Sequence, residues 1–175
     1  MNSFNDALQK AGIMPGTDGY DKKKVISFTL EMKLLEMKNH IASLDRMYEK
    51  YLTAEGQDQF DLMDGLANRF GYMVIAFQDI MTTISRLTGA ANSSEQFSIR
   101  RSISEFQSVF EKECASSSLD NAVSSMADRN EIVHVYENYR SNMEMVLENV
   151  QNYRIEYGMI FQILWNYCET NKILK

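Results

Sequence analysis

The sequence predicts an all-α fold, a four-to-five-helix up-and-down bundle, and three observations lead to this expectation. Proline occurs once in 175 residues, at Pro15, so almost nothing interrupts a helix after the first segment. Apolar residues recur at steps of three and four over long stretches, which is the spacing of one helix face. No stretch of strand length alternates strictly between apolar and polar residues, and no hairpin signal lies between β-branched runs, so we expect no sheet.

Two long helices are expected first. Apolar periodicity predicts one from about Asp21 to Leu52, and a turn at Glu55-Gly56 separates it from a second that ends at Thr88-Gly89. These helices should pack antiparallel as a long pair. Gly65 and Gly71 lie inside the second helix and cost stability relative to alanine, so we expect a close helix approach there.

The second half of the chain predicts a third helix over about 95–113, a short helical turn over 119–126 and a long C-terminal helix. The stripe of this last helix runs from about Arg129 to Cys168. Residues 1–20 are interpreted as an N-terminal extension and residues 21–175 as a single helical domain.

Charge and composition argue against some classes of function. The formal net charge of −6 and the pI near 5.0 argue against a broad electrostatic contact with a nucleic-acid backbone, so RNA would be held at a small basic site or with help from a partner. The basic runs are Lys22-Lys23-Lys24 and Arg100-Arg101. Nowhere do eighteen uncharged apolar residues occur in succession, which predicts a soluble, cytoplasmic protein without membrane contact. Cys114 and Cys168 indicate free thiols, and neither a metal site nor a cofactor is expected.

One polar cluster, Arg129-Asn130-Glu131-Ile132-Val133-His134-Val135-Tyr136, carries the functional prediction. Asp128 and Glu131 have the spacing of a capping box, which would place Arg129 in the first turn of a helix. That turn favours a phosphate, and arginine offers a planar fork of donors for it. Asn130, four residues before His134, would orient the imidazole.

The division of chemistry follows from the side chains. Histidine exchanges protons near neutral pH and arginine does not, so His134 would act as general acid or base and Arg129 as phosphate clamp. Such a pair suits attack of an RNA 2′-hydroxyl on the adjacent phosphate, which needs no metal. The other interpretation is that Arg129 and His134 are ordinary capping and surface residues.

A resemblance favours the catalytic interpretation. An arginine followed by a polar residue and, four to six positions later, by a histidine on the last long helix resembles the HEPN superfamily of helical nucleotide-binding proteins and ribonucleases. Arg129, Asn130, His134 and Tyr136 match the Arg-Asn-x-x-x-His-x-Tyr string of HepT-like toxins position by position. The likeness is strong over roughly residues 119–157 and architectural over the two preceding helices.

The resemblance implies a metal-independent endoribonuclease toxin, a hydrolase that works as a homodimer with its arginine-histidine pairs in one cleft. It also implies a minimal nucleotidyltransferase antitoxin that attaches AMP to Tyr136. The alternative is a non-catalytic nucleotide- or substrate-binding subunit of such a transferase, which the acidic charge favours. His40, with no acidic or cysteine partner at ligand spacing, is interpreted as a satisfied or exposed histidine.

Overall fold

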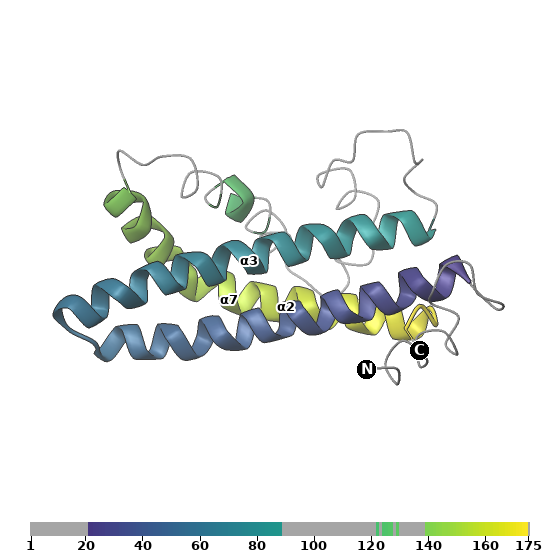
Figure 1. Cartoon of the computed structure of the whole chain (residues 1–175), viewed down its shortest axis with the longest axis horizontal. Coiled ribbons are helices and arrows are strands. Elements are labelled where there is room, and N and C mark those ends of the chain that lie inside the picture. Colours follow the sequence, from purple (N-terminus) through teal and green to yellow (C-terminus); the bar gives the residue numbers. More distant parts are fainter. Residues whose placement is uncertain (1–20, 89–121, 123, 128, 130–138, 175) are drawn as a thin grey trace, which may run out of the picture.

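The computed structural model describes residues 21–88, 122, 124–127, 129 and 139–174 of the chain. These residues form three long helices and no strand, with bounds α2 (Lys22–Thr53), α3 (Gly56–Thr88) and α7 (Tyr139–Thr170). Figure 1 shows α2 and α3 as one long hairpin with α7 lying along it. The expected all-α bundle is confirmed, and the two long helices begin and end within a few residues of their predicted positions. The predicted N-terminal extension and the predicted helix over 95–113 lie outside the described residues.

Local sequence explains where the hairpin helices begin. The side chain of Asp21 accepts a hydrogen bond of 2.8 Å from the backbone N–H of Lys23, so Asp21 is the N-cap of α2. At the other end, Gly56 has a φ of 60°, a left-handed conformation that favours glycine over residues with a Cβ. The predicted turn at Glu55-Gly56 is therefore confirmed, and it brings the chain straight back along α2.

Side chains fix the register of the hairpin. Three contacting pairs mark the register from the turn outwards: Met47 with Gly65, His40 with Tyr72, and Lys33 with Asp79. Residue numbers fall along α2 as they rise along α3, so the helices are antiparallel, as predicted. A Cβ at Gly65 would collide with the methyl carbon of Met47, so the glycine leaves room for this side chain from α2.

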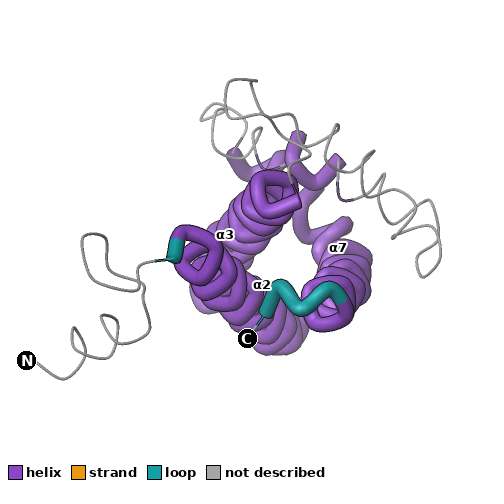
Figure 2. Tube along the Cα trace, turned by 90° about the vertical axis from the view of Figure 1, so that its right-hand side faces the viewer, coloured by secondary structure: helices purple, strands orange, loops and turns teal. Residues whose placement is uncertain are grey.

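Helix α7 closes the core (Figure 2) and runs in the same direction as α3 (Figure 1). Phe70 stacks on Tyr153 with ring centroids 5.3 Å apart, and one to two turns further Phe77 meets the edge of Tyr157 at 5.4 Å. Apolar side chains from all three helices fill the space between them, among them Leu34, Leu44, Met73, Ile80, Ile160 and Leu164. Burial of this apolar surface is the main driving force for the bundle.

A polar contact joins α7 to α2 at the edge of the core. Arg154 Nη1 lies 3.1 Å from Asp45 Oδ1 and 3.4 Å from Glu49 Oε1. Its guanidinium carbon also lies 4.9 Å from the centre of the Tyr48 ring, a cation–π contact. Because the Arg154 side chain is only 17% exposed, water screens these contacts less than it would on an open surface.

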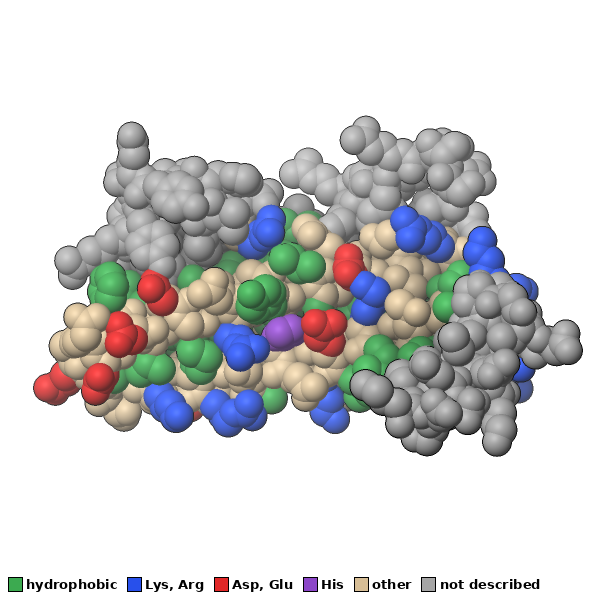
Figure 3. Space-filling view, viewed as in Figure 1, with side chains coloured by type: hydrophobic (Ala, Val, Ile, Leu, Met, Phe, Trp, Pro, Cys, Tyr) green, Lys and Arg blue, Asp and Glu red, His purple; other side chains and the backbone are tan. Residues whose placement is uncertain are grey.

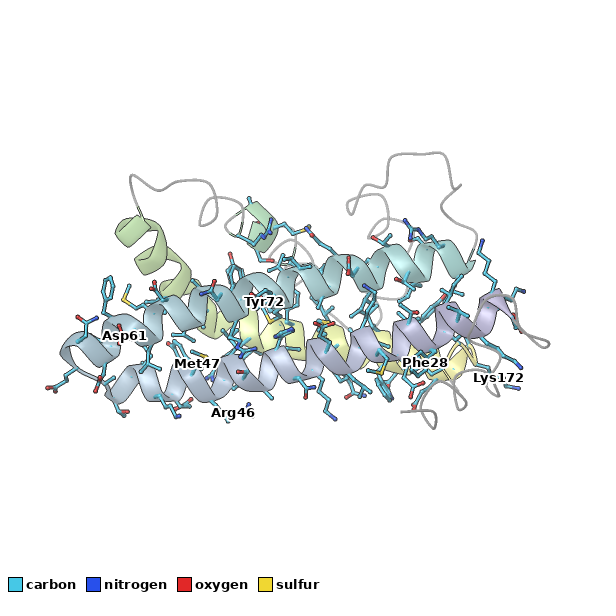
Figure 4. The ribbon with its side chains drawn as sticks, viewed as in Figure 1. Phe28, Arg46, Met47, Asp61, Tyr72 and Lys172 are labelled. Atoms are coloured by element: carbon cyan, nitrogen blue, oxygen red, sulfur yellow. The ribbon has the colours of Figure 1, made fainter. Side chains whose placement is uncertain are left out.

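The C-terminal end of α7 is capped without a glycine. Lys172 has a φ of 55°, and the next backbone N–H, that of Ile173, donates to the Cys168 carbonyl at 2.8 Å. The Lys172 N–H donates to the Glu169 carbonyl at 3.0 Å. These two bonds have the pattern of a Schellman motif, in which the left-handed position is usually glycine. Figure 4 labels Lys172 at this end of the bundle.

Two glycine replacements should separate helix propensity from packing. Gly158→Ala should raise the free energy of unfolding by about 0.5–1 kcal/mol, since no described atom lies within 4 Å of the added Cβ. Gly65→Ala should gain less, because the Met47 methyl must move away. Urea denaturation of both variants measures the difference. An equal gain at the two positions would show that the Met47 contact does not constrain the hairpin.

Candidate functional site

A buried hydrogen bond between the hydroxyls of Ser125 and Tyr157 joins the segment before the predicted cluster to α7. Residues 122 and 124–127 are helical, and Ser125 is fully buried. The Ser125 hydroxyl donates to the Ala122 carbonyl at 2.8 Å, so its oxygen accepts from the Tyr157 hydroxyl at 2.7 Å. Burial raises the pKa of Tyr157 far above its ordinary value, and the bond to Ser125 offsets only part of this effect. Tyr157 therefore stays a neutral donor.

Arg129 follows four residues after Ser125 and lies against α3. Its Cγ is 3.9 Å from the position that a Cβ would take at Gly71, an ordinary van der Waals distance. The residue is half-buried, and its Nε is shielded from solvent. An arginine held in this way is not a plain surface residue. The described side chain nearest to Gly71 is therefore that of Arg129, which belongs to the segment before α7.

The other predicted site residues, Asn130, His134 and Tyr136, lie outside the described residues, as do Asp128 and Glu131. Their arrangement around Arg129 stays a prediction. Helix α7 is described from Tyr139, three residues after the end of the cluster.

A second candidate group of side chains surrounds His40. A hollow of about 420 Å³ lies between α2 and α3, with a described lining of Met32, Leu35, Glu36, Asn39, His40 and Arg69. Nε2 of His40 is 3.6 Å from Glu36 Oε1, and its ring stacks on Tyr72 with centroids 5.6 Å apart and an interplanar angle of 28°. Tyr72 is 53% exposed and is labelled in Figure 4. In Figure 3 the histidine lies between basic and acidic side chains.

This surrounding corrects the interpretation of His40. An acidic residue, Glu36, does lie one helical turn before it, and Nδ1 of His40 is buried without a hydrogen-bond partner among the described residues. The spacing of four between Glu36 and His40 was the available signal. Arg69, the lining residue that comes from α3, could not be assigned from local spacing, because it belongs to another helix.

The two groups meet at one turn of α3. Gly71, against which Arg129 lies, and Tyr72, on which His40 stacks, are consecutive residues. Successive side chains of a helix point about 100° apart. Arg129 and His40 therefore contact neighbouring faces of the same turn, and the Tyr72 ring on which His40 stacks is exposed.

Three further findings concern metal binding, membrane spanning and similarity to known proteins. Within the described part of the chain, no three His, Cys, Asp or Glu side chains come together in a way that could hold a metal ion. No described helix is long and apolar enough to cross a membrane. Comparison with family models, with curated proteins and with solved structures finds no match for this chain.

Cys168 should be chemically inert while the protein is folded. The thiol is fully buried, and burial raises its pKa to about 12. The thiolate is the reactive form, so a disulfide reagent near neutral pH should label native Cys168 far more slowly than the unfolded chain. A Cys114→Ser variant isolates this thiol.

The raised pKa of Cys168 also makes the stability of the folded protein depend on pH. A thiol pKa raised by folding contributes stability that is complete below the ordinary value of about 9 and is lost as the pH rises towards about 12. Alkaline unfolding of Cys168→Ala should be less steep over this window. Rapid labelling of the native thiol would contradict both statements.

Proposed function

We propose that the chain is a metal-independent endoribonuclease of the HEPN type, the toxin of a toxin-antitoxin pair. The observation that carries this proposal is the Arg-Asn-x-x-x-His-x-Tyr string from Arg129 to Tyr136. Arg129 supports the proposal, because it is half-buried against α3, whereas the other interpretation treats it as an ordinary capping or surface residue. The helical bundle is compatible with the family that the string resembles.

The chemistry assigns one task to each residue. His134 takes the proton from an RNA 2′-hydroxyl, and the 2′-oxygen attacks the adjacent phosphorus. The bond to the 5′-oxygen breaks, that oxygen takes up the proton that His134 carries, and a 2′,3′-cyclic phosphate remains. Arg129 binds the phosphate and stabilises the charge that grows on it in the transition state. Asn130 orients the imidazole of His134.

The partners belong to the same proposal. A homodimer would bring two arginine-histidine pairs into one cleft, and Ile155 and Met159 on α7 give it an apolar contact. These side chains are 55% and 42% exposed, and their spacing of four places them on one helix face. A minimal nucleotidyltransferase would silence the toxin by attaching AMP to Tyr136, which lies seven residues from Arg129.

A non-catalytic nucleotide- or substrate-binding subunit is the second candidate. The hollow at His40 favours it, because Arg69 in its lining attracts phosphate. The exposed ring of Tyr72, which stacks on His40, can stack on a base. In this case RNA or nucleotide would bind and leave unchanged.

Replacement of two residues separates these functions. His134→Ala removes the proton carrier but leaves Arg129, so RNA cleavage should fall by about 10²- to 10⁴-fold while RNA binding persists. Arg129→Ala should weaken both binding and cleavage. Cleavage is measured with purified protein freed of its partner, and binding by fluorescence anisotropy.

The expected products carry 2′,3′-cyclic phosphate ends. Circular dichroism serves as the control for folding of each variant. If the wild-type protein leaves RNA intact, or if His134→Ala cuts as fast as wild type, the ribonuclease proposal is wrong and the binding-subunit proposal takes its place.

The dimer has its own test. Ile155→Glu combined with Met159→Glu should convert a dimer to a monomer in light scattering at micromolar concentration, because two charges would be buried in the contact. Leu52→Glu is the control, since Leu52 is an apolar residue that is 58% exposed near the end of α2 and does not belong to α7. A wild-type monomer at this concentration would overturn the homodimer.

A further inference from the structure

A basic groove lies at the far end of the hairpin from its turn. It is formed between the first turns of α2 and the last turns of α3 and has a volume of about 950 Å³. Its described lining consists of Lys22, Lys23, Ile26, Thr29, Lys33, Asp79, Thr82, Thr83, Arg86 and Leu87. Cationic, hydroxyl and apolar groups thus share one cavity.

The groove lining holds more positive than negative side chains. Lys33 is paired with Asp79, the one carboxylate in the described lining. Lys22, Lys23 and Arg86 are exposed and form no salt bridge with any residue that the structure describes. Three positive charges therefore remain to be balanced, which suits a ligand with more than one phosphate charge.

The threonine hydroxyls in the groove act as acceptors. Thr29, Thr82 and Thr83 each donate to the backbone carbonyl four residues earlier in their own helix, at distances of 2.8, 2.8 and 2.7 Å. A hydroxyl has one proton, so each oxygen has only lone pairs left for a ligand. These oxygens match a ligand that carries hydroxyl donors as well as anionic groups.

From these two sets of groups we infer that the groove binds ribose phosphate, with phosphates on the free cations and sugar hydroxyls on the threonine oxygens. Ile26 and Leu87 supply an apolar wall for the sugar or base. The ligand class includes a stretch of RNA and a free nucleotide. The inference goes beyond the proposed nuclease activity and does not require that the chain cleave RNA.

The charge pattern of the hairpin favours an anion at this end. Between Lys22 and His40 there are five lysines and two glutamates, whereas residues 45–64 hold six acidic and two basic residues. Figure 3 shows acidic side chains gathered around the hairpin turn. A polyanion is thus attracted to the groove and repelled from the turn, although the whole chain has a net charge of −6.

Binding is measured in the full chain carrying His134→Ala, so that RNA is not consumed. The probes are a labelled single-stranded RNA, DNA of the same sequence, and ATP and inorganic tripolyphosphate as competitors. RNA should bind several-fold more tightly than DNA, because only RNA offers the 2′-hydroxyl. ATP should compete better than tripolyphosphate. If ATP binds and RNA does not, the groove takes a free nucleotide, as the inference allows.

Matched variants locate the site. Lys22→Glu with Arg86→Glu should lower affinity by about tenfold and flatten its salt dependence. Lys24→Glu with Lys38→Glu makes the same change in net charge on exposed residues outside the groove lining and should lower it by no more than about twofold. Thr82→Val should reduce the preference for RNA over DNA.

Three results would overturn the inference. Equal losses in the two charge-reversed pairs would show that attraction is spread over the surface. Equal affinity for RNA and DNA, with ATP no better than tripolyphosphate, would remove the role of the threonines. Absence of binding by every probe would leave no site. Since none of these readouts is cleavage, they are distinct from failure of the proposed nuclease activity.

Discussion

Antiparallel packing of α2 on α3 is the constraint on which the remaining features depend. The register set by Met47 at Gly65 brings His40 to Tyr72 and Lys33 to Asp79. A shift of one residue would turn each side chain by about 100° and break all three pairs together. The hollow at His40 and the basic groove are both lined by residues from the two helices, so neither exists without this register.

The bond between Ser125 and Tyr157 has a comparable role for the segment before α7. A buried hydroxyl without a partner costs about 1–3 kcal/mol, so other positions of this segment that leave either group unsatisfied are disfavoured. The bond therefore contributes specificity more than stability. It also determines where Arg129, one turn later, meets α3.

The sequence was sufficient for the long helices but not for their functional contacts. Periodicity and the glycine at position 56 are local signals, and they predicted α2, α3 and their turn. For His40 the local signal was Glu36, four residues earlier, whereas Tyr72 and Arg69 come from another helix and could not be assigned by spacing. Ser125 lies in a serine-rich stretch with no local sign of burial. The left-handed Lys172 was equally hidden, since lysine has no preference for that conformation. The interpretation of Asn130, His134 and Tyr136 rests on the sequence string alone, because they lie outside the described residues.

The unequal charge of the hairpin ends has a consequence for how the molecule meets other molecules. Opposite charges separated along a rod of about 50 Å, the length of a 32-residue helix, give the hairpin a large electric dipole moment. In the field of a polyanion this dipole experiences a torque before any atoms touch, so the hairpin turns its basic end forward during diffusion. Orientation of this kind raises the fraction of productive collisions, and it is reduced as dissolved salt shortens the screening length to about 8 Å.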